Sequence, residues 1–254
     1  MIRLDDVRFS IGGQEVLKGV GLHVARGDTK VVLGASGSGK SVLLKLILGL
    51  YRPDRGTITI ADQNIARMTQ EELYGVRQKI AMVFQGGALF DSLTVRENVG
   101  YRLNEQGILS EEDIERRVFE SLSFVDLADT LDKMPGELSG GMRKRLAIAR
   151  AIAADPEVIL FDEPTSGLDP INAFNINRLI LRLRRKEGVT SVVVTHDLAS
   201  AFVVADRIAM LHDGKIIFDG TAEELRRSQD ERVHMFLQPA VFERDADKKK
   251  GATP

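Results

Sequence analysis

A glycine-rich segment between two apolar runs constrains the fold of this chain more than any other feature. Its eight residues are Gly34-Ala35-Ser36-Gly37-Ser38-Gly39-Lys40-Ser41. The run before it, 30–33, has the length of a buried strand, and the apolar residues of 41–50 recur at helical spacing. A strand, a glycine-rich turn and a helix in this order turn successive backbone N–H groups and the positive end of the helix toward one anion. The segment therefore predicts a phosphate-binding loop in an α/β fold.

The residue types inside this loop indicate a nucleoside triphosphate as the ligand. The segment satisfies G-x-x-x-x-G-K-[ST], the pattern of the P-loop. Lys40 is expected to reach the β and γ phosphates and to act in catalysis, and the Ser41 hydroxyl is expected to ligate Mg²⁺. With Val42 added, the stretch 34–42 is the predicted triphosphate-binding segment. A flexible Gly/Ser loop is the alternative, and the strand and helix on either side argue against it.

Two adjacent carboxylates at the end of another apolar run supply the acidic half of the predicted site. The run 158–161 is entirely apolar and ends in Asp162 and Glu163, as expected of a buried strand that delivers acids to the carboxyl edge of a parallel sheet. Neighbouring side chains on a strand point in opposite directions. We therefore expect Asp162 to face the metal ion and Glu163 to orient the attacking water. Alone, this motif also fits a strand followed by an Asp-Glu-Pro turn.

Composition excludes several other kinds of site. The chain has no cysteine, which excludes disulfides, thiolate metal sites and cysteine nucleophiles, and its four histidines show no metal-ligand spacing. Its 35 basic and 37 acidic residues give a net charge of −2, so no global basic field attracts nucleic acid or anionic lipid. The N-terminus does not resemble a signal peptide. No run approaches the roughly 20 apolar residues of a spanning helix, so we expect a chain that does not cross a membrane by itself.

The order of secondary-structure signals indicates two intertwined lobes. Short β-type runs separated by Gly12-Gly13 and other turn residues predict an antiparallel sheet in the first thirty residues. Between 87 and 149 helical periodicity replaces the strand signals. We therefore expect an α/β lobe over 1–86 and 150–238, interrupted by a helical lobe over 87–149. The polar composition of 239–254 predicts a disordered tail.

Three further motifs follow the phosphate loop in a fixed order. They are Leu138-Ser139-Gly140-Gly141-Met142, Ser166-Gly167-Leu168-Asp169 and Thr195-His196-Asp197. With the loop and the acid pair, they make the chain resemble the ATP-binding cassette of ABC transporters over nearly its whole length. The resemblance implies a P-loop NTPase core of RecA-like α/β type, with an N-terminal antiparallel β subdomain and an inserted α-helical lobe. It implies one ABC ATPase domain over 1–238.

The resemblance assigns roles in hydrolysis to two residues outside the loop and the acid pair. It implies that Gln85 joins the Ser41 hydroxyl and the Asp162 carboxylate around Mg²⁺. It also implies that His196 contacts the γ phosphate and acts with Glu163 in catalysis. ATP and Mg²⁺ are therefore the expected cofactors, and the expected reaction is hydrolysis of ATP to ADP and phosphate.

The resemblance further implies that two copies of the chain share each ATP site. In such a head-to-tail dimer, Ser139, Gly140 and Gly141 contact the ATP held by the loop of the other copy, and Asp169 crosses the interface. The helix start after Ser139 is a second anion-binding N-terminus, which one chain cannot close onto its own phosphates. Ile11 stands where many members of the family stack an aromatic residue on adenine, so the contact expected there is with an aliphatic side chain.

A longer stretch around Gln85 resembles a narrower group within the family. It is Phe84-Gln85-Gly86-Gly87-Ala88-Leu89-Phe90-Asp91-Ser92-Leu93-Thr94-Val95. The motif 138–142 occupies the place of the family's signature motif, and Met142 stands where that signature usually has glutamine. With 165–171 and with this Met142, the stretch looks like the ATPases of Mla- and Mce-type lipid transporters.

This narrower resemblance implies the cargo and the partners. It implies an ATPase that powers phospholipid or other lipid transport at the bacterial inner membrane, held peripherally on the cytoplasmic face by a separate permease. The permease is expected to dock near Gln85–Leu93, with Leu89, Phe90 and Leu93 as an apolar anchor. A lipid-binding Mce-type protein is expected in the same complex.

Three other functions fit part of the sequence. ATPases of polar amino-acid importers share most of the same residues. A cassette protein acting on DNA or ribosomes would draw support from a basic cluster, which the solvated face of a helix explains better. The cluster consists of Arg182, Arg184, Arg185 and Lys186. A P-loop kinase of a small metabolite would have no use for 138–142. We expect no nucleic-acid partner.

Overall fold

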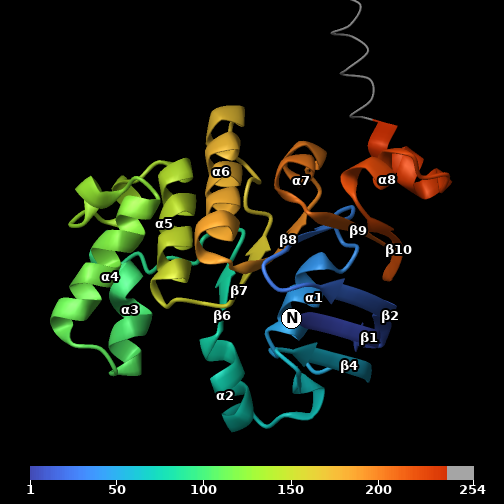
Figure 1. Cartoon of the computed structure of the whole chain (residues 1–254), viewed down its shortest axis with the longest axis horizontal. Helices are drawn as coiled ribbons and strands as arrows, with labels where there is room; N and C mark the ends of the chain where they lie inside the picture. The colour runs from blue at the N-terminus through green and yellow to red at the C-terminus, as the bar shows by residue number, and fades with distance from the viewer. Residues whose placement is uncertain (239–254) are drawn as a thin grey trace, which may run out of the picture.

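The computed structural model describes residues 1–238, apart from the side chains of residues 186 and 187. The disordered tail predicted over 239–254 lies outside the described residues. The described chain contains a six-stranded and a four-stranded sheet, with helices packed around them (Figure 1). It is therefore a mixed α/β fold, as predicted.

The six-stranded sheet forms the centre of the molecule. Its strands, in spatial order, are β10 (Lys215–Gly220), β9 (Arg207–His212), β3 (Thr29–Leu33), β8 (Thr190–Thr195), β7 (Val158–Asp162) and β6 (Ile80–Val83). All neighbours are parallel except β9 and β10, which form a hairpin. Every residue of β3, β7 and β8 is buried, which explains their nearly continuous apolar sequence. Because β3, β8 and β7 are adjacent and parallel, the segments that follow them meet at one edge of the sheet.

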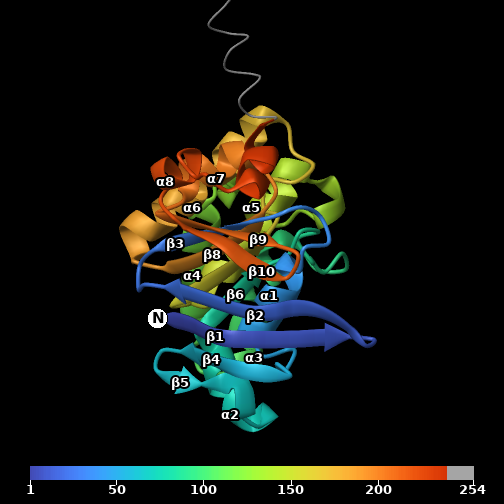
Figure 2. The same ribbon diagram turned by 90° about the vertical axis from the view of Figure 1, so that its right-hand side faces the viewer.

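The second sheet is antiparallel and contains the N-terminus. Its spatial order is β2 (Gln14–Val24), β1 (Ile2–Ile11), β4 (Arg55–Ile60) and β5 (Gln63–Asn64). Figure 2 shows it below β9 and β10. The turn between β1 and β2 places Gly12 and Gly13 at φ 58° and 82°, values that favour glycine. The antiparallel sheet predicted for the first thirty residues is confirmed, and β4 and β5 extend it with residues that follow the phosphate loop.

The helices form two groups. One group lies along the sheets and comprises α1 (Lys40–Ile47), α2 (Gln70–Gln78), α6 (Pro170–Glu187), α7 (Leu198–Val204), α8 (Ala222–Arg226) and a helical segment over 231–238. The other lies to one side in Figure 1 and comprises α3 (Val95–Gln106), α4 (Glu111–Phe124) and α5 (Gly140–Ala153). Short 3-10 turns are η1 (Ile65–Arg67), η2 (Ala128–Thr130) and η3 (Pro135–Glu137). Because α5 continues to Ala153, the lobe boundary proposed at residue 150 falls inside a helix.

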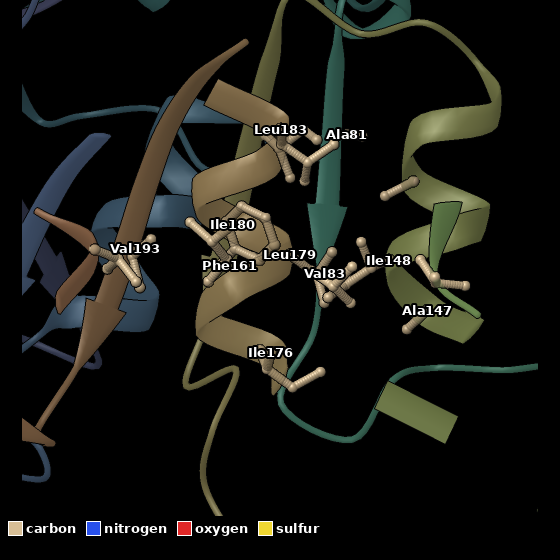
Figure 3. Close-up of a cluster of buried hydrophobic side chains, with 14 of the residues drawn as sticks. Ala81, Val83, Ala147, Ile148, Phe161, Ile176, Leu179, Ile180, Leu183 and Val193 are labelled. Atoms are coloured by element: carbon tan, nitrogen blue, oxygen red, sulfur yellow. The ribbon is translucent and has the colours of Figure 1, made fainter. Parts of the chain in front are cut away.

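Two apolar cores lie on opposite faces of the central sheet. Alternate residues of β3 supply them, since Val31 and Leu33 belong to one cluster and Val32 to the other. The first cluster also contains Ile148 of α5 together with residues of α6 and β7 (Figure 3). This shared core ties α5 to the strands. The N-terminus of α5, with its Ser-Gly-Gly sequence, therefore has a fixed place relative to the phosphate loop.

A buried asparagine fixes the segment between β6 and α3. The side chain of Asn98 is fully buried. Its amide oxygen accepts from the Phe90 N–H at 2.9 Å. Its amide nitrogen donates to the carbonyl oxygens of Phe90, Leu93 and Thr94 at 3.0, 2.9 and 3.0 Å. One side chain therefore replaces a strand or helix as the hydrogen-bonding partner of this loop.

We predict that Asn98→Ala lowers the free energy of unfolding by at least about 2 kcal/mol, because it leaves several buried backbone groups without partners. Chemical denaturation of the purified variant measures this change. Asn104→Ala is the matched control, since Asn104 lies on the same helix but is exposed. An equal effect of the two substitutions would show that helix composition, and not the loop contact, determines the loss.

Candidate functional site

The glycine-rich segment forms the loop between β3 and the start of α1. Gly37 and Gly39 adopt φ 80° and 102°, in the region that favours glycine. At Gly34 a β-carbon would lie 2.5 Å from the carbonyl oxygen of Leu211 and 2.6 Å from the Ser38 hydroxyl, so only glycine fits. Both the shape of the loop and its packing on β9 therefore require glycines at the positions that the phosphate-binding pattern specifies.

The Lys40 side chain folds back over this loop. Its Nζ donates to the carbonyl oxygens of Gly34 and Ala35 at 2.8 and 3.0 Å. The side chain is only 7% exposed. The ammonium group is thus held against the loop by the loop's own carbonyl oxygens.

Asp162 lies at the end of β7, beside the first turn of α1. The Ser41 hydroxyl donates to its Oδ1 at 3.0 Å. Burial raises the pKa of the Asp162 carboxyl, and the hydrogen bond from Ser41 opposes this shift. A buried carboxylate with only part of its charge compensated is a favourable ligand for a cation.

The next residue, Glu163, has a strained backbone and a fully engaged carboxylate. Its φ is 47°, a left-handed value that costs roughly 1–2 kcal/mol for a residue other than glycine. Its Oε2 accepts from the Thr195 hydroxyl at 3.0 Å and lies 2.9 Å from His196 Nδ1. Its Oε1 lies 3.5 Å from Lys40 Nζ. Since a carboxylate only accepts, His196 Nδ1 carries the proton in this contact.

Lys40, Ser41, Glu163 and His196 line one cleft of about 330 Å³. The lining residues are Val16, Ser36, Gly37, Gly39, Lys40, Ser41, Val42, Gln85, Glu163 and His196. The structure therefore brings together the phosphate loop, the loop glutamine, the acid after β7 and the histidine after β8. Val16 of β2 was not predicted, because its place beside Gly39 depends on how the antiparallel sheet packs on the loop, and no sequence motif marks it.

Some of the predicted ATP-binding residues do not line this cleft. Ile11, at the end of β1, is 48% exposed and is absent from the lining. Ser139 and Gly140 are exposed at the N-terminus of α5 and are also absent from it. The Ser139 hydroxyl accepts from the Met142 N–H at 3.3 Å and so caps the helix. Within one chain, the Ser-Gly-Gly segment and the phosphate loop do not form one site.

The Ser-Gly-Gly segment instead contacts the start of α6. A β-carbon at Gly141 would lie 2.4 Å from Asn172 Oδ1, so a larger residue would have to displace the Asn172 side chain. Asn172 Nδ2 donates to Asp169 Oδ2 at 2.5 Å. Hydrogen bonds from the backbone and side chain of Asn172 lower the pKa of the Asp169 carboxyl. Asp169 therefore caps α6 as an anion, and Asn172, which was not predicted, links it to the signature.

The donor set at the cleft suits magnesium better than a softer metal. Ser41 and Gln85 line the cleft with a hydroxyl and an amide. Asp162 is not part of the lining, but its carboxylate accepts from the Ser41 hydroxyl, and all three residues offer hard oxygen atoms. Among residues 1–238, no three His, Cys, Asp or Glu side chains are grouped so that they could hold a metal ion. A cation here would therefore depend on substrate phosphates for its remaining ligands, as Mg²⁺ commonly does.

Comparison with known proteins identifies the family. A family model described as ABC transporter matches residues 17–166. The chain belongs to the ABC transporter family. The resemblance to ABC transporter ATPases, inferred from the order of the sequence motifs, is confirmed. The chain is an ABC ATPase.

Individual relatives cover nearly all of this ABC ATPase. It is 41% identical over 238 residues to the intermembrane phospholipid transport system ATP-binding protein MlaF of Haemophilus influenzae, which is 94% of this chain and 90% of that protein. It is 39% identical over 236 residues to the probable ribonucleotide transport ATP-binding protein mkl of Mycobacterium bovis, covering 93% of this chain and 66% of that protein.

A solved structure is similar over most of the fold. The ATP-binding cassette MJ0796, in a dimeric post-hydrolysis state bound to ADP and Pi, superimposes with a TM-score of 0.79 at 35% identity, covering 87% of this chain and 98% of that chain. Within residues 1–238 of the present ATPase, no helix is both long enough and apolar enough to cross a membrane.

We predict that Glu163→Gln lowers the rate of ATP hydrolysis at least ~100-fold, because the amide cannot accept a proton from the attacking water. ATP affinity should change little, since Lys40 and the loop remain. Phosphate release and equilibrium nucleotide binding measure the two effects. Glu157→Gln is the control. Glu157 lies just before the first residue of β7, at the other end of the strand from Glu163, and pairs with Arg26 and Lys79. Normal phosphate release by Glu163→Gln would exclude Glu163 as the base.

Proposed function

We propose that this ABC ATPase binds ATP and Mg²⁺ at the cleft and powers phospholipid transport through a separate membrane permease, as part of a head-to-tail dimer. The observation that carries this proposal is the convergence of the phosphate loop, Gln85, Glu163 and His196 on one cleft, in a chain 41% identical to a phospholipid transport ATPase.

The chemistry follows from the contacts of the cleft residues. Phosphate oxygens entering the loop would replace the Gly34 and Ala35 carbonyls as partners of Lys40, which frees its charge to act on the ligand. Glu163 would orient the attacking water and accept its proton, while His196 holds the carboxylate in place. Mg²⁺, held by Ser41, Asp162 and Gln85, would neutralise charge that develops on the phosphates.

A second copy would complete the site. Ser139 and Gly140 are exposed and do not line the cleft of their own chain, yet they begin a 14-residue helix, whose first N–H groups favour an anion. The similar cassette MJ0796 is dimeric. In the proposed dimer these residues and Gly141 contact the ATP of the other copy, and Asp169 lies at the interface.

A larger groove is the proposed permease site. It has a volume of about 570 Å³ and is lined by residues of α2, β6, α3, α5 and the loop between β6 and α3. Among them are the exposed aromatic residues Tyr74, Phe90 and Tyr101. The rings of Phe90 and Tyr101 lie 4.5 Å apart. The groove suits the apolar face of a short helix. A permease helix docked in this groove would hold the ATPase peripherally at the cytoplasmic face of the inner membrane.

The predicted apolar anchor for the permease overlaps this groove only in part. Of the three residues expected to form it, only Phe90 lines the groove. Leu89 packs against the core, and Leu93 is partly buried outside the groove lining. The hydrogen bonds of Asn98 to Phe90 and Leu93 fix the course of this loop. Along it, Phe90 faces the groove while the adjacent Leu89 packs against the core.

The cargo rests on the relatives. MlaF, named for phospholipid transport, matches over 90% of its length, whereas mkl, named for probable ribonucleotide transport, matches over 66%. The polar amino-acid importer is not favoured by these relatives. A lipid-binding Mce-type protein is part of the proposed complex.

The basic cluster on α6 gives little support to a nucleic-acid function. Arg182 lies over the Phe124 ring at 4.4 Å. Arg184 forms an ion pair with Asp206. Two of the four basic side chains thus have partners within the chain.

We predict that Ser139→Arg reduces ATP turnover at least about tenfold, because it obstructs a contact made only to the ATP of the second copy. The affinity of the monomer for ATP should stay within about twofold. Ser110→Arg is the matched control, since Ser110 also caps a helix through its hydroxyl and is exposed, so both variants lose one cap. Equal losses of binding and turnover in Ser139→Arg would mean that the signature acts only within its own chain.

We predict that Phe90→Asp leaves basal ATP hydrolysis of the isolated ATPase nearly unchanged but abolishes its stimulation by the permease in phospholipid vesicles, because a charge replaces an apolar contact. Stimulated phosphate release and phospholipid transfer between labelled vesicles measure this. Phe119→Asp is the control, since Phe119 is similarly exposed on α4 but lies outside the groove lining. A native complex that responds to amino acids and not to phospholipid would refute the cargo.

A further inference from the structure

Lys144 is a buried lysine on the helix that starts at the signature. It lies in the second turn of α5 and is 9% exposed. Its Nζ donates to the main-chain carbonyl of Gln85 and, at 3.4 Å, to that of Glu163. One side chain of α5 therefore contacts the backbone of the proposed metal ligand after β6 and of the proposed base after β7.

A lysine is a costly choice at this position. Burial lowers the pKa of the Lys144 ammonium, and the negative charges of Asp162 and Glu163 oppose this shift. The hydrogen bonds of Lys144 go to carbonyl oxygens and not to those carboxylates. An apolar side chain would fill the space without this desolvation cost. The N–H donors of Lys144 therefore indicate a role in hydrogen bonding in addition to packing.

Both carbonyl groups belong to residues whose placement matters for hydrolysis. The backbone of Glu163 is strained, with φ 47°, and its N–H donates to the Val194 carbonyl at 2.9 Å. Lys144 fixes the other side of the same residue. Gln85 is exposed, and its side-chain amide donates to the Ser166 hydroxyl at 3.4 Å, which is a long contact. The bond from Lys144 to its carbonyl is therefore an important restraint on Gln85.

We propose that Lys144 is a positioning residue for ATP hydrolysis, which holds the backbone of Glu163 and Gln85 from the helix that begins at the signature. Contact of Ser139 with the ATP of a second copy would then be transmitted along α5 to the base and to the metal ligand. Lys144 acts in this way only if Glu163 and Gln85 have the roles proposed above.

The test compares Lys144→Met with wild type. Methionine keeps an unbranched, flexible side chain that is one atom shorter, and it removes the donors and the charge. We expect kcat to fall at least about tenfold, since a small displacement of a catalytic group has effects of this size or larger. We expect the KM for ATP and the equilibrium affinity for ATP to stay within about twofold. Lys144→Arg, which retains donors and charge, should recover a measurable part of kcat.

Arg145→Met is the matched control. Arg145 is the next residue on α5 and also donates to main-chain carbonyls, those of Val125 and Asp126, which lie outside the cleft. It should change the melting temperature but not kcat per folded molecule. If Lys144→Met does the same, the role of Lys144 is structural and the proposal is overturned. If Lys144→Met does not fold, Lys144→Gln, which keeps an amide donor, takes its place under the same criteria.

A second substitution identifies the route. Gln85→Ala keeps the carbonyl that Lys144 contacts but removes the amide at the metal site. If Lys144 acts partly through Gln85, the double variant should lose less kcat than the product of the two single losses. Fully multiplicative losses would overturn this part of the proposal.

Glu163→Gln separates this inference from the proposed function. If that variant retains turnover, the role of Glu163 is wrong and the inference fails with it. If Glu163→Gln is inactive while Lys144→Met keeps wild-type kcat, the role of Lys144 alone fails.

Discussion

The site depends on the adjacency of three parallel strands, β3, β8 and β7, whose carboxyl ends lie at one edge of the central sheet. The phosphate loop follows β3, the acid pair ends β7, and His196 follows β8. The hydrogen bond between Ser41 and Asp162 joins residues 121 positions apart in sequence. Burial of these strands on both faces fixes their register, and the register in turn places three separate sequence motifs in one cleft.

Charge pairing within the cleft offsets the cost of burying its ionisable side chains. Lys40 is buried but is held by two loop carbonyls and lies near Glu163, and Glu163 is held by Thr195 and His196. A buried ammonium or carboxylate without partners would be strongly destabilising. The same charges are available to a triphosphate and a cation, which would take over the contacts that the protein groups make with each other. The strained backbone of Glu163 fits a residue whose position serves the reaction more than the fold.

Sequence patterns predicted the parts of the site that are local in the chain. The phosphate loop, the acid pair and the helix after the loop depend on residues within about ten positions of one another, and pattern rules apply on that scale. They did not predict Val16 beside Gly39, Asn172 against Gly141, or Lys144 on the carbonyl of Gln85. Each of these contacts joins segments that only tertiary packing brings together.

The placement of Leu89 and Leu93 outside the groove has the same origin. Their apolar character suggested a joint anchor with Phe90, whereas the direction of each side chain depends on the course of the loop, which the four hydrogen bonds of Asn98 restrain. Those bonds leave Phe90 in the groove and turn Leu89 to the core. A nucleotide-dependent change at Gln85 would reach Phe90 through a main chain that Asn98 and Lys144 hold at two points. The groove and the cleft are therefore connected by a short, restrained segment and not by a flexible loop. If a permease docks in the groove as proposed, this segment is a physical route by which hydrolysis would be coupled to it.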